Sequence, residues 1–144
     1  MQKYNSLLIN LGLMTLLLAI GYFLISSLIY LDPINFCKIG IDEDILRGNK
    51  QTIYSAMQLL KNQDFPSYQT MCKYVDNISE NPCPISHAPT GVVSDAQAPG
   101  CYIKGSRIIY LIPDKNDSPD IIKQRAAAIA KYSKLSQKFW DNFY

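Results

Sequence analysis

The longest apolar run in the chain extends from Leu7 to Leu31 and contains no Asp, Glu, Lys, Arg or His. As a helix rising about 1.5 Å per residue, it would extend over about 37 Å. That length is sufficient to cross a hydrocarbon core of about 30 Å. Ser26 and Ser27 are followed by further apolar residues, so no small-residue cleavage site ends the run. The pattern predicts a retained signal anchor over residues 1–31, which crosses a lipid bilayer through residues 7–31.

Asp32-Pro33 marks the end of the predicted span, because proline disfavours helical geometry in the residue before it. Residues 32–41 are predicted to form a juxtamembrane connector that lies on a sheet edge or on the membrane surface. The remaining residues, 42–144, are sufficient for one small domain.

Two stretches of this domain have apolar residues at helical spacing. The first covers residues 43–62, after Asp42, and forms either one helix or a helix interrupted at Gly48-Asn49, where Asn49 would cap a second start. The second follows Pro66, and its apolar face consists of Tyr68, Met71, Cys72, Val75 and Ile78. Residues 79–100 contain four prolines and no sustained periodicity, which predicts a loop.

A β-hairpin is predicted over residues 101–112, where CYI and RIIYLI flank Lys104-Gly105-Ser106. Two strands alone are marginal, and residues 34–41 are the candidate third strand. A final helix is predicted from the N-cap Ser118 to about Phe143. The pattern therefore predicts an α+β fold: one N-terminal transmembrane helix, then a small disulfide-stapled domain of about three helices and a β-hairpin or small antiparallel sheet.

The final helix is amphipathic at 100° per residue. Four lysines fall within an arc of about 80° opposite much of its apolar surface: Lys123, Lys131, Lys134 and Lys138. This arc is either a solvated face or, together with Trp140, an interaction surface for anionic lipid headgroups or an acidic partner. Arg125 falls on the apolar side, so we expect it to need an acidic partner that the sequence does not identify.

All four cysteines follow the apolar run, and an even number in a small domain is typical of disulfides in an oxidising compartment. We therefore expect an extracytoplasmic domain and a cytoplasmic N-terminus. Local folding favours the pairs Cys72–Cys83 and Cys37–Cys101. The alternative, Cys83–Cys101 with Cys37–Cys72, would clamp the proline-rich loop at both ends.

Charge and motifs exclude several function classes. Of the 14 Lys and Arg, only Lys3 precedes the span, so the rest nearly balance 12 Asp and Glu. A nearly neutral domain has no overall positive electrostatic potential to attract nucleic acid, so we expect no nucleic-acid partner. His87 is the only histidine, which excludes HExxH and multi-histidine zinc sites. No cofactor, metal site or catalytic residue is predicted.

The hairpin from Gly100-Cys101-Tyr102 to Ile109-Tyr110-Leu111 is similar to the strand pair before the zinc-binding helix of some bacterial membrane-anchored peptidases. The helix that follows it, IIKQRAAAIAKYSKLSQKFW, contains no zinc ligand. The similarity covers about a dozen residues and implies at most a catalytically empty relative of such a peptidase.

Two function classes remain. The favoured one is a single-pass, membrane-anchored extracytoplasmic interaction protein, which serves as a non-catalytic accessory or scaffold subunit with a protein partner in the membrane or envelope. The alternative is a membrane-anchored enzyme or metal protein. It would use His87 with the cysteines, either as a Cys3His zinc centre or as a Cys83/His87 nucleophilic pair.

Overall fold

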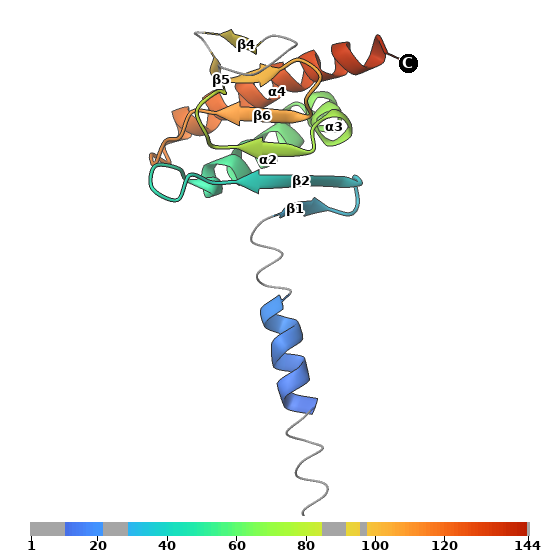
Figure 1. Cartoon of the computed structure of the whole chain (residues 1–144), viewed down its shortest axis with the longest axis vertical. Coiled ribbons are helices and arrows are strands. Elements are labelled where there is room, and N and C mark those ends of the chain that lie inside the picture. The colour runs from blue at the N-terminus through green and yellow to red at the C-terminus, as the bar shows by residue number, and fades with distance from the viewer. Residues whose placement is uncertain (1–10, 22–28, 85–91, 96–97, 144) are drawn as a thin grey trace, which may run out of the picture.

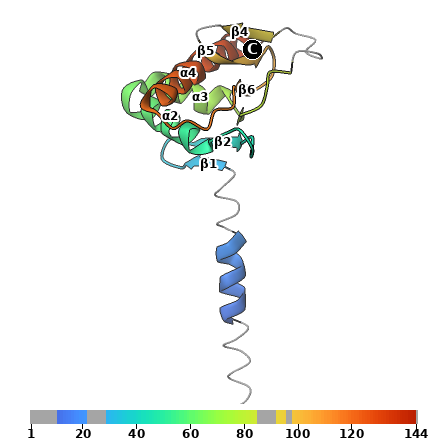
Figure 2. The same ribbon diagram turned by 90° about the vertical axis from the view of Figure 1, so that its left-hand side faces the viewer.

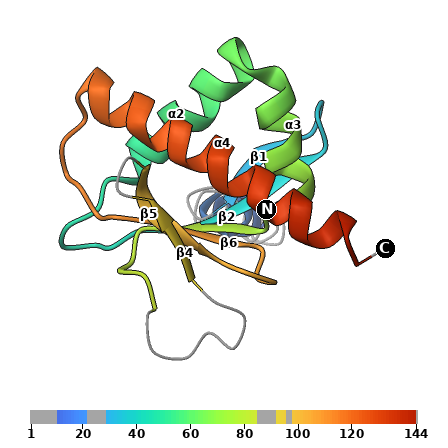
Figure 3. The ribbon, with the colours of Figure 1, turned by 90° about the horizontal axis from the view of Figure 1, so that it is seen from above.

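A computed structural model describes residues 11–21, 29–84, 92–95 and 98–143. From Ile29 onward, the described strands form one sheet in the order β1-β2-β3-β6-β5-β4, and helices α2, α3 and α4 cover one face of it (Figures 1 and 3). The predicted α+β class and the presence of disulfides are confirmed. The sheet is larger than the predicted hairpin or small antiparallel sheet, and it is partly parallel.

Residues 11–21 are helical, and almost all of them are exposed. Among the described residues, no helix has the combined length and apolar character that a bilayer crossing needs. The rest of the predicted span up to residue 28 lies outside the described residues. The assignment of residues 29–31, the end of the predicted span, to a helix was wrong, because they begin strand β1 (Ile29–Asp32). In this strand Tyr30 and Asp32 are buried and Leu31 is exposed.

Strand β1 pairs antiparallel with β2 (Cys37–Asp42), from Ile29 opposite Gly40 to Asp32 opposite Cys37. The segment predicted as a connector therefore belongs to the sheet. Its inward residues in β2, Cys37, Ile39 and Ile41, are buried under the helices. Residues 34–41 do supply a strand, but β2 lies beside β3 rather than beside the predicted hairpin.

Helix α2 (Lys50–Gln63) begins where the interrupted form of the prediction placed it. The Asn49 side chain caps it by accepting a hydrogen bond from the Gln51 N–H. Helix α3 (Phe65–Tyr74) follows after a single residue, Asp64, whose side chain accepts from the Ser67 N–H. The prediction that this helix continues to Ile78 was wrong. Its apparent last turn is an extended segment that leads into a strand.

That strand, β3 (Asn77–Ser79), is short and central. It pairs in parallel with β2 on one side and with β6 (Ile108–Leu111) on the other. Ile78 is fully buried between Ile41 and Ile109, its register partners. The strand thus connects the N-terminal hairpin to the C-terminal half of the sheet.

The predicted hairpin is confirmed as β5 (Ala98–Ile103) and β6, in which Cys101 lies opposite Tyr110. Gly105 has a φ of 83° in the turn, a conformation that glycine adopts without a steric penalty. Strand β4 (Val92–Asp95) adds to β5 at the far edge. The prediction of a loop over residues 79–100 was therefore wrong for β3, β4 and the start of β5.

Helix α4 (Pro119–Asp141) is the longest described helix and has the predicted start. The Ser118 hydroxyl accepts from the Ile121 N–H, and Asp120 lies in the first turn. The helix packs against α2, α3, β5 and β6, so it lies across one face of the sheet (Figures 2 and 3). Ala128, Ile129 and Tyr132 on its inner side are fully buried.

Arg125 has the acidic partner that its position on the apolar side requires. Its guanidinium forms an ion pair with Glu80, and both side chains are almost completely buried. The guanidinium also donates to the backbone carbonyls of Asn49, Ile112 and Asp114. Glu80 directly follows β3, Asn49 directly precedes α2, and Ile112 and Asp114 follow β6. The side chain of Arg125 on α4 therefore connects the ends of two central strands to two helices. A Cβ atom at Gly48 would overlap the Glu80 carboxylate, which explains the glycine there.

Removal of one partner of this ion pair should be far more costly than loss of a surface pair. We expect Glu80→Gln to lower the free energy of unfolding by roughly 3–5 kcal/mol, because it leaves the Arg125 charge buried without a counter-charge. Glu43→Gln, which removes the partly exposed pair with Lys50, should cost less than about 1 kcal/mol. Urea titration of the full chain in detergent, followed by circular dichroism, measures both. Equal losses would contradict this role of Glu80.

Candidate interaction surfaces and the Asp32 cluster

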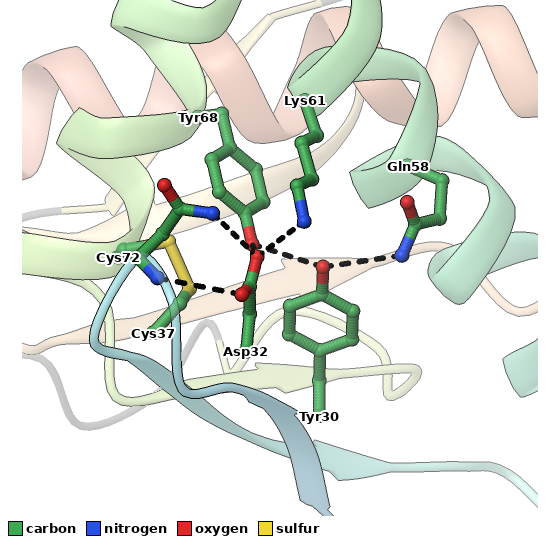
Figure 4. Close-up of a disulfide and its surroundings, with 8 residues drawn as sticks. Tyr30, Asp32, Cys37, Gln58, Lys61, Tyr68 and Cys72 are labelled. Atoms are coloured by element: carbon green, nitrogen blue, oxygen red, sulfur yellow. Dashed lines mark hydrogen bonds and ion pairs between the residues drawn. A yellow bond between two sulfur atoms is a disulfide. The ribbon is translucent and has the colours of Figure 1, made fainter.

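The most concentrated polar site in the described chain is built around Asp32 at the end of β1 (Figure 4). Lys61 of α2 lies 2.6 Å from Asp32 Oδ2, and the Tyr68 hydroxyl of α3 donates to the same oxygen at 2.7 Å. The Asn35 side chain donates to it as well, at 2.8 Å. Asp32 is 6% exposed. One carboxylate therefore connects the first strand to two helices.

Two tyrosines extend this cluster. The hydroxyls of Tyr30 and Tyr68 lie 2.9 Å apart, and Gln58 donates to the Tyr30 hydroxyl at 3.3 Å. The Tyr30 ring lies edge-on to the Tyr68 ring, with centroids 6.5 Å apart. Both ring systems belong to the buried core. The cluster therefore combines packing and hydrogen bonding under the N-terminal hairpin.

The charges in the cluster stabilise one protonation state. Hydrogen bonds from Lys61, Asn35 and Tyr68 hold the pKa of the Asp32 carboxyl well below its usual value. The Asp32 carboxylate raises the pKa of Lys61 in turn. Burial raises the pKa of Tyr68, and its bonds to Tyr30 and Asp32 raise it further. None of these three groups exchanges a proton near neutral pH, so the arrangement suits a structural clamp rather than acid–base catalysis.

A disulfide closes the same region. Cys37 at the start of β2 is bonded to Cys72 of α3, beside the Asp32 cluster (Figure 4). The second disulfide joins Cys83 to Cys101 of β5. The favoured pairing of Cys72 with Cys83 and Cys37 with Cys101 was therefore wrong, and the alternative pairing is found. The reason is β3, which carries the chain away from α3 and across the sheet before Cys83.

This result bears on the cysteine-based alternatives. All four cysteines are in disulfides, so neither a Cys3His zinc centre nor a Cys83 nucleophile has the thiolate it requires. His87 lies outside the described residues. Within the part of the chain that the structure describes, no three His, Cys, Asp or Glu side chains come together as possible metal ligands.

The predicted lysine surface lies on the outer side of α4. Lys123, Lys131, Lys134 and Lys138 are all exposed, as the helical spacing predicts. Trp140 is partly buried, and its ring lies edge-on to Phe139 with centroids 5.5 Å apart. Whether this surface binds a partner stays a prediction.

Two hollows flank the C-terminal end of α4, and each combines aromatic and cationic side chains. The larger, of about 520 Å³, is lined by Lys73, Tyr74, Arg107, Trp140 and Asp141. The other, of about 320 Å³, has Tyr102, Phe139 and Phe143 beside Lys104 and Lys138. Lys73 lies over the Tyr74 ring, 4.9 Å from its centroid. Aromatic residues and Arg are enriched at protein-binding surfaces, and the positive charge beside them is complementary to acidic groups on a partner.

The chain matches no protein-family model, and comparisons with curated proteins and with solved structures found no similar protein.

Sequence reasoning did not identify the Asp32 cluster. Asp32 was interpreted only as the end of the span, because the residues before it are continuously apolar. The available signal was a period of two, in which Tyr30 and Asp32 point to the same face of a strand. The partners on α2 and α3 are far away in sequence, so no local pattern connects them to Asp32.

Replacement of Asp32 should have a pH-dependent effect on stability. The lowered pKa means that the carboxylate contributes its full stabilisation above the usual Asp pKa of about 3.9. Asp32→Asn should therefore destabilise the protein at pH 7, and the difference from the wild type should shrink as the pH falls below about 4. Urea titrations of the full chain between pH 7 and pH 3 measure it.

The matched control is Asp117→Asn, which removes an exposed carboxylate from the loop before α4. A difference between wild type and Asp32→Asn that stays constant down to pH 3 would contradict the clamp. The clamp would also be contradicted if Asp32→Asn lowered the free energy of unfolding at pH 7 by no more than Asp117→Asn does.

Proposed function

We propose that this chain is a single-pass, membrane-anchored extracytoplasmic interaction protein that serves as a non-catalytic accessory or scaffold subunit of a membrane or envelope assembly. Residues 7–28, the part of the apolar run before β1, would hold it in the bilayer. The two disulfides support an oxidising compartment for the domain.

One observation carries the proposal. In the described domain, the cysteines and the buried charged side chains are already engaged with partners inside the fold. The cysteines pair with cysteines, Asp32 with Lys61 and Tyr68, and Glu80 with Arg125. Along α4, the exposed features are instead lysines, with partly exposed aromatic rings at its C-terminal end. Such a distribution favours binding to a partner over chemistry on a substrate.

The partner that fits this surface is a protein with an acidic segment. Lys123, Lys134 and Lys138 project from one side of α4, and Lys138 also borders the hollow beside Phe139. Steering by complementary charge would bring such a segment to the helix. The aromatic hollows at its C-terminal end would then supply the desolvated contacts that dominate binding energy.

Charge reversal tests the partner. We expect the triple variant Lys123→Glu, Lys134→Glu and Lys138→Glu to lose its partner. The proteins that co-purify with the wild-type full chain from gently solubilised membranes should no longer co-purify with this variant. The three side chains are exposed, so the midpoint of thermal unfolding should hardly change. The matched control replaces the same three lysines with Arg and should retain the partner. Unchanged co-purification in the Glu variant would contradict the proposed surface.

Amine labelling tests the topology, since Lys3 and the domain lysines are predicted on opposite sides of the membrane. A membrane-impermeant amine reagent applied to intact cells should modify Lys123 and Lys134 but not Lys3. Permeabilised cells should show modification of all three, which serves as the internal control. Peptide mass mapping reads both samples. Labelling of the domain lysines only after permeabilisation would contradict an extracytoplasmic domain.

A further inference from the structure

Exposed apolar side chains are concentrated near the N-terminal edge of the domain. From Ile29 onward, eight large apolar residues are exposed in the described chain, and five of them fall between residues 31 and 46: Leu31, Ile34, Phe36, Ile45 and Leu46. Ile34, Phe36 and Ile45 are exposed by 83%, 93% and 89%. Single exposed apolar residues are normal on soluble surfaces, but a concentration in one region indicates contact with something apolar.

These residues lie at both ends of one edge of the sheet. Ile34 and Phe36 belong to the turn that joins β1 to β2, while Ile45 and Leu46 belong to the loop after β2. Because the two strands are antiparallel, that loop leaves β2 at the end opposite the β1–β2 turn (Figure 1). β1 is an edge strand of the sheet. The apolar side chains therefore bracket this edge.

The turn is held rigidly in the conformation that exposes them. At its first end, Asp32 accepts hydrogen bonds from the Asn35 side chain and backbone N–H, at 2.8 and 3.4 Å. At its other end, Cys37 is bonded to Cys72 of α3. These restraints fix both ends of the turn that carries the exposed Ile34 and Phe36.

Phe36 also has a backbone conformation that its side chain disfavours. Its φ is 51°, and it is the one described non-glycine residue with a positive φ. Glycine or asparagine is usual at such a position, because a bulky side chain is strained there. A phenylalanine that is both strained and exposed brings no benefit to the fold, which indicates that its ring has a role outside it.

We propose that this β1–β2 edge rests on the surface of the bilayer that holds the anchor, with Ile34 and Phe36 at one end and Ile45 and Leu46 at the other inserted among the lipid headgroups. The inference rests on the proposed anchor. The occupant follows from the chain itself, since β1 begins within the last residues of the predicted span, at Ile29. Phe36 follows Ile29 by seven residues, which reach at most about 25 Å.

This contact would orient the domain. A flexible tether would let any face meet the membrane, but an edge clamped by Asp32 and Cys37 holds the opposite edge, β4, away from it. The proposed partner surface on α4 would then be presented at a defined angle to the bilayer.

Tryptophan quenching in lipid nanodiscs tests this contact. The full chain, carrying Trp140→Phe to remove its only tryptophan, is placed in phosphatidylcholine and phosphatidylglycerol discs with or without bromine on the upper acyl carbons. Single tryptophans are introduced as Phe36→Trp, as Phe143→Trp and, within the anchor, as Leu17→Trp. Phe143 is the matched control, because it is an exposed phenylalanine (69%) in the turn that follows α4.

We expect Phe36→Trp to lose roughly half of its emission in brominated discs, because surface-bound side chains insert about 5–10 Å into the headgroup and acyl boundary. Leu17→Trp should also be quenched, and Phe143→Trp should not. If Leu17→Trp is quenched and Phe36→Trp is not, the anchor stands and the edge contact is overturned. Equal quenching at 36 and 143 also overturns it. An unquenched Leu17→Trp overturns the anchor and, with it, the contact.

Discussion

The buried carboxylate of Asp32 determines how the N-terminal segment meets the rest of the protein. Asp32 closes the first strand, and without compensation its burial would be costly. Lys61 and Tyr68, from two successive helices, supply that compensation within 2.6–2.7 Å. Because the donors belong to α2 and α3, the first strand cannot separate from the helices without leaving a charge unpaired. The disulfide between Cys37 and Cys72 adds a covalent restraint to the same junction. By the chain-entropy model, that link contributes about 3–4 kcal/mol.

A second buried pair, Arg125 with Glu80, has the same role at the opposite ends of the parallel strands. Its members lie on α4 and directly after β3, and its carbonyl partners lie before α2 and after β6. The fold is therefore held by two ionic clusters, one under the N-terminal hairpin and one at the carboxyl ends of β3 and β6. Between them lies an apolar layer of isoleucine, methionine and tyrosine side chains.

The features that could be predicted are those encoded locally. Capping residues located the start of α4 at Ser118 and gave Asn49 as one of two alternatives for the start of α2, and a glycine turn located the β5–β6 hairpin. Arg125 could be recognised as needing a partner because one charge interrupts an apolar helix face. Glu80 could not be identified, since it lies 45 residues earlier and beside a strand of only three residues. That strand escaped prediction because Val75 and Ile78 continue the helical spacing of α3. The error over β3 then led to the wrong disulfide pairing.

The candidate site was harder to predict than the fold. The lysines of α4 could be placed on one exposed face from their spacing, and the structure agrees with that placement. An edge or membrane-surface position could be predicted for residues 32–41, which include Ile34 and Phe36, but not for Ile45 and Leu46, because apolar residues at helical spacing are ordinarily assigned to a buried helix face. The turn that carries Ile34 and Phe36 is fixed by tertiary restraints at Asp32 and Cys37, which no local pattern encodes.

The central claim is that the β1–β2 hairpin, from Ile29 to Asp42, is an integral, clamped part of the domain rather than a connector outside it. Hydrogen exchange of the full chain in nanodiscs tests it most directly, through the amides that pair β1 with β2. The account predicts that these amides open with free energies close to those of β3, because Asp32 and the disulfide hold the hairpin to the helices. Exchange of the β1–β2 amides at rates near those of an unprotected chain, while β3 remains protected, would contradict it.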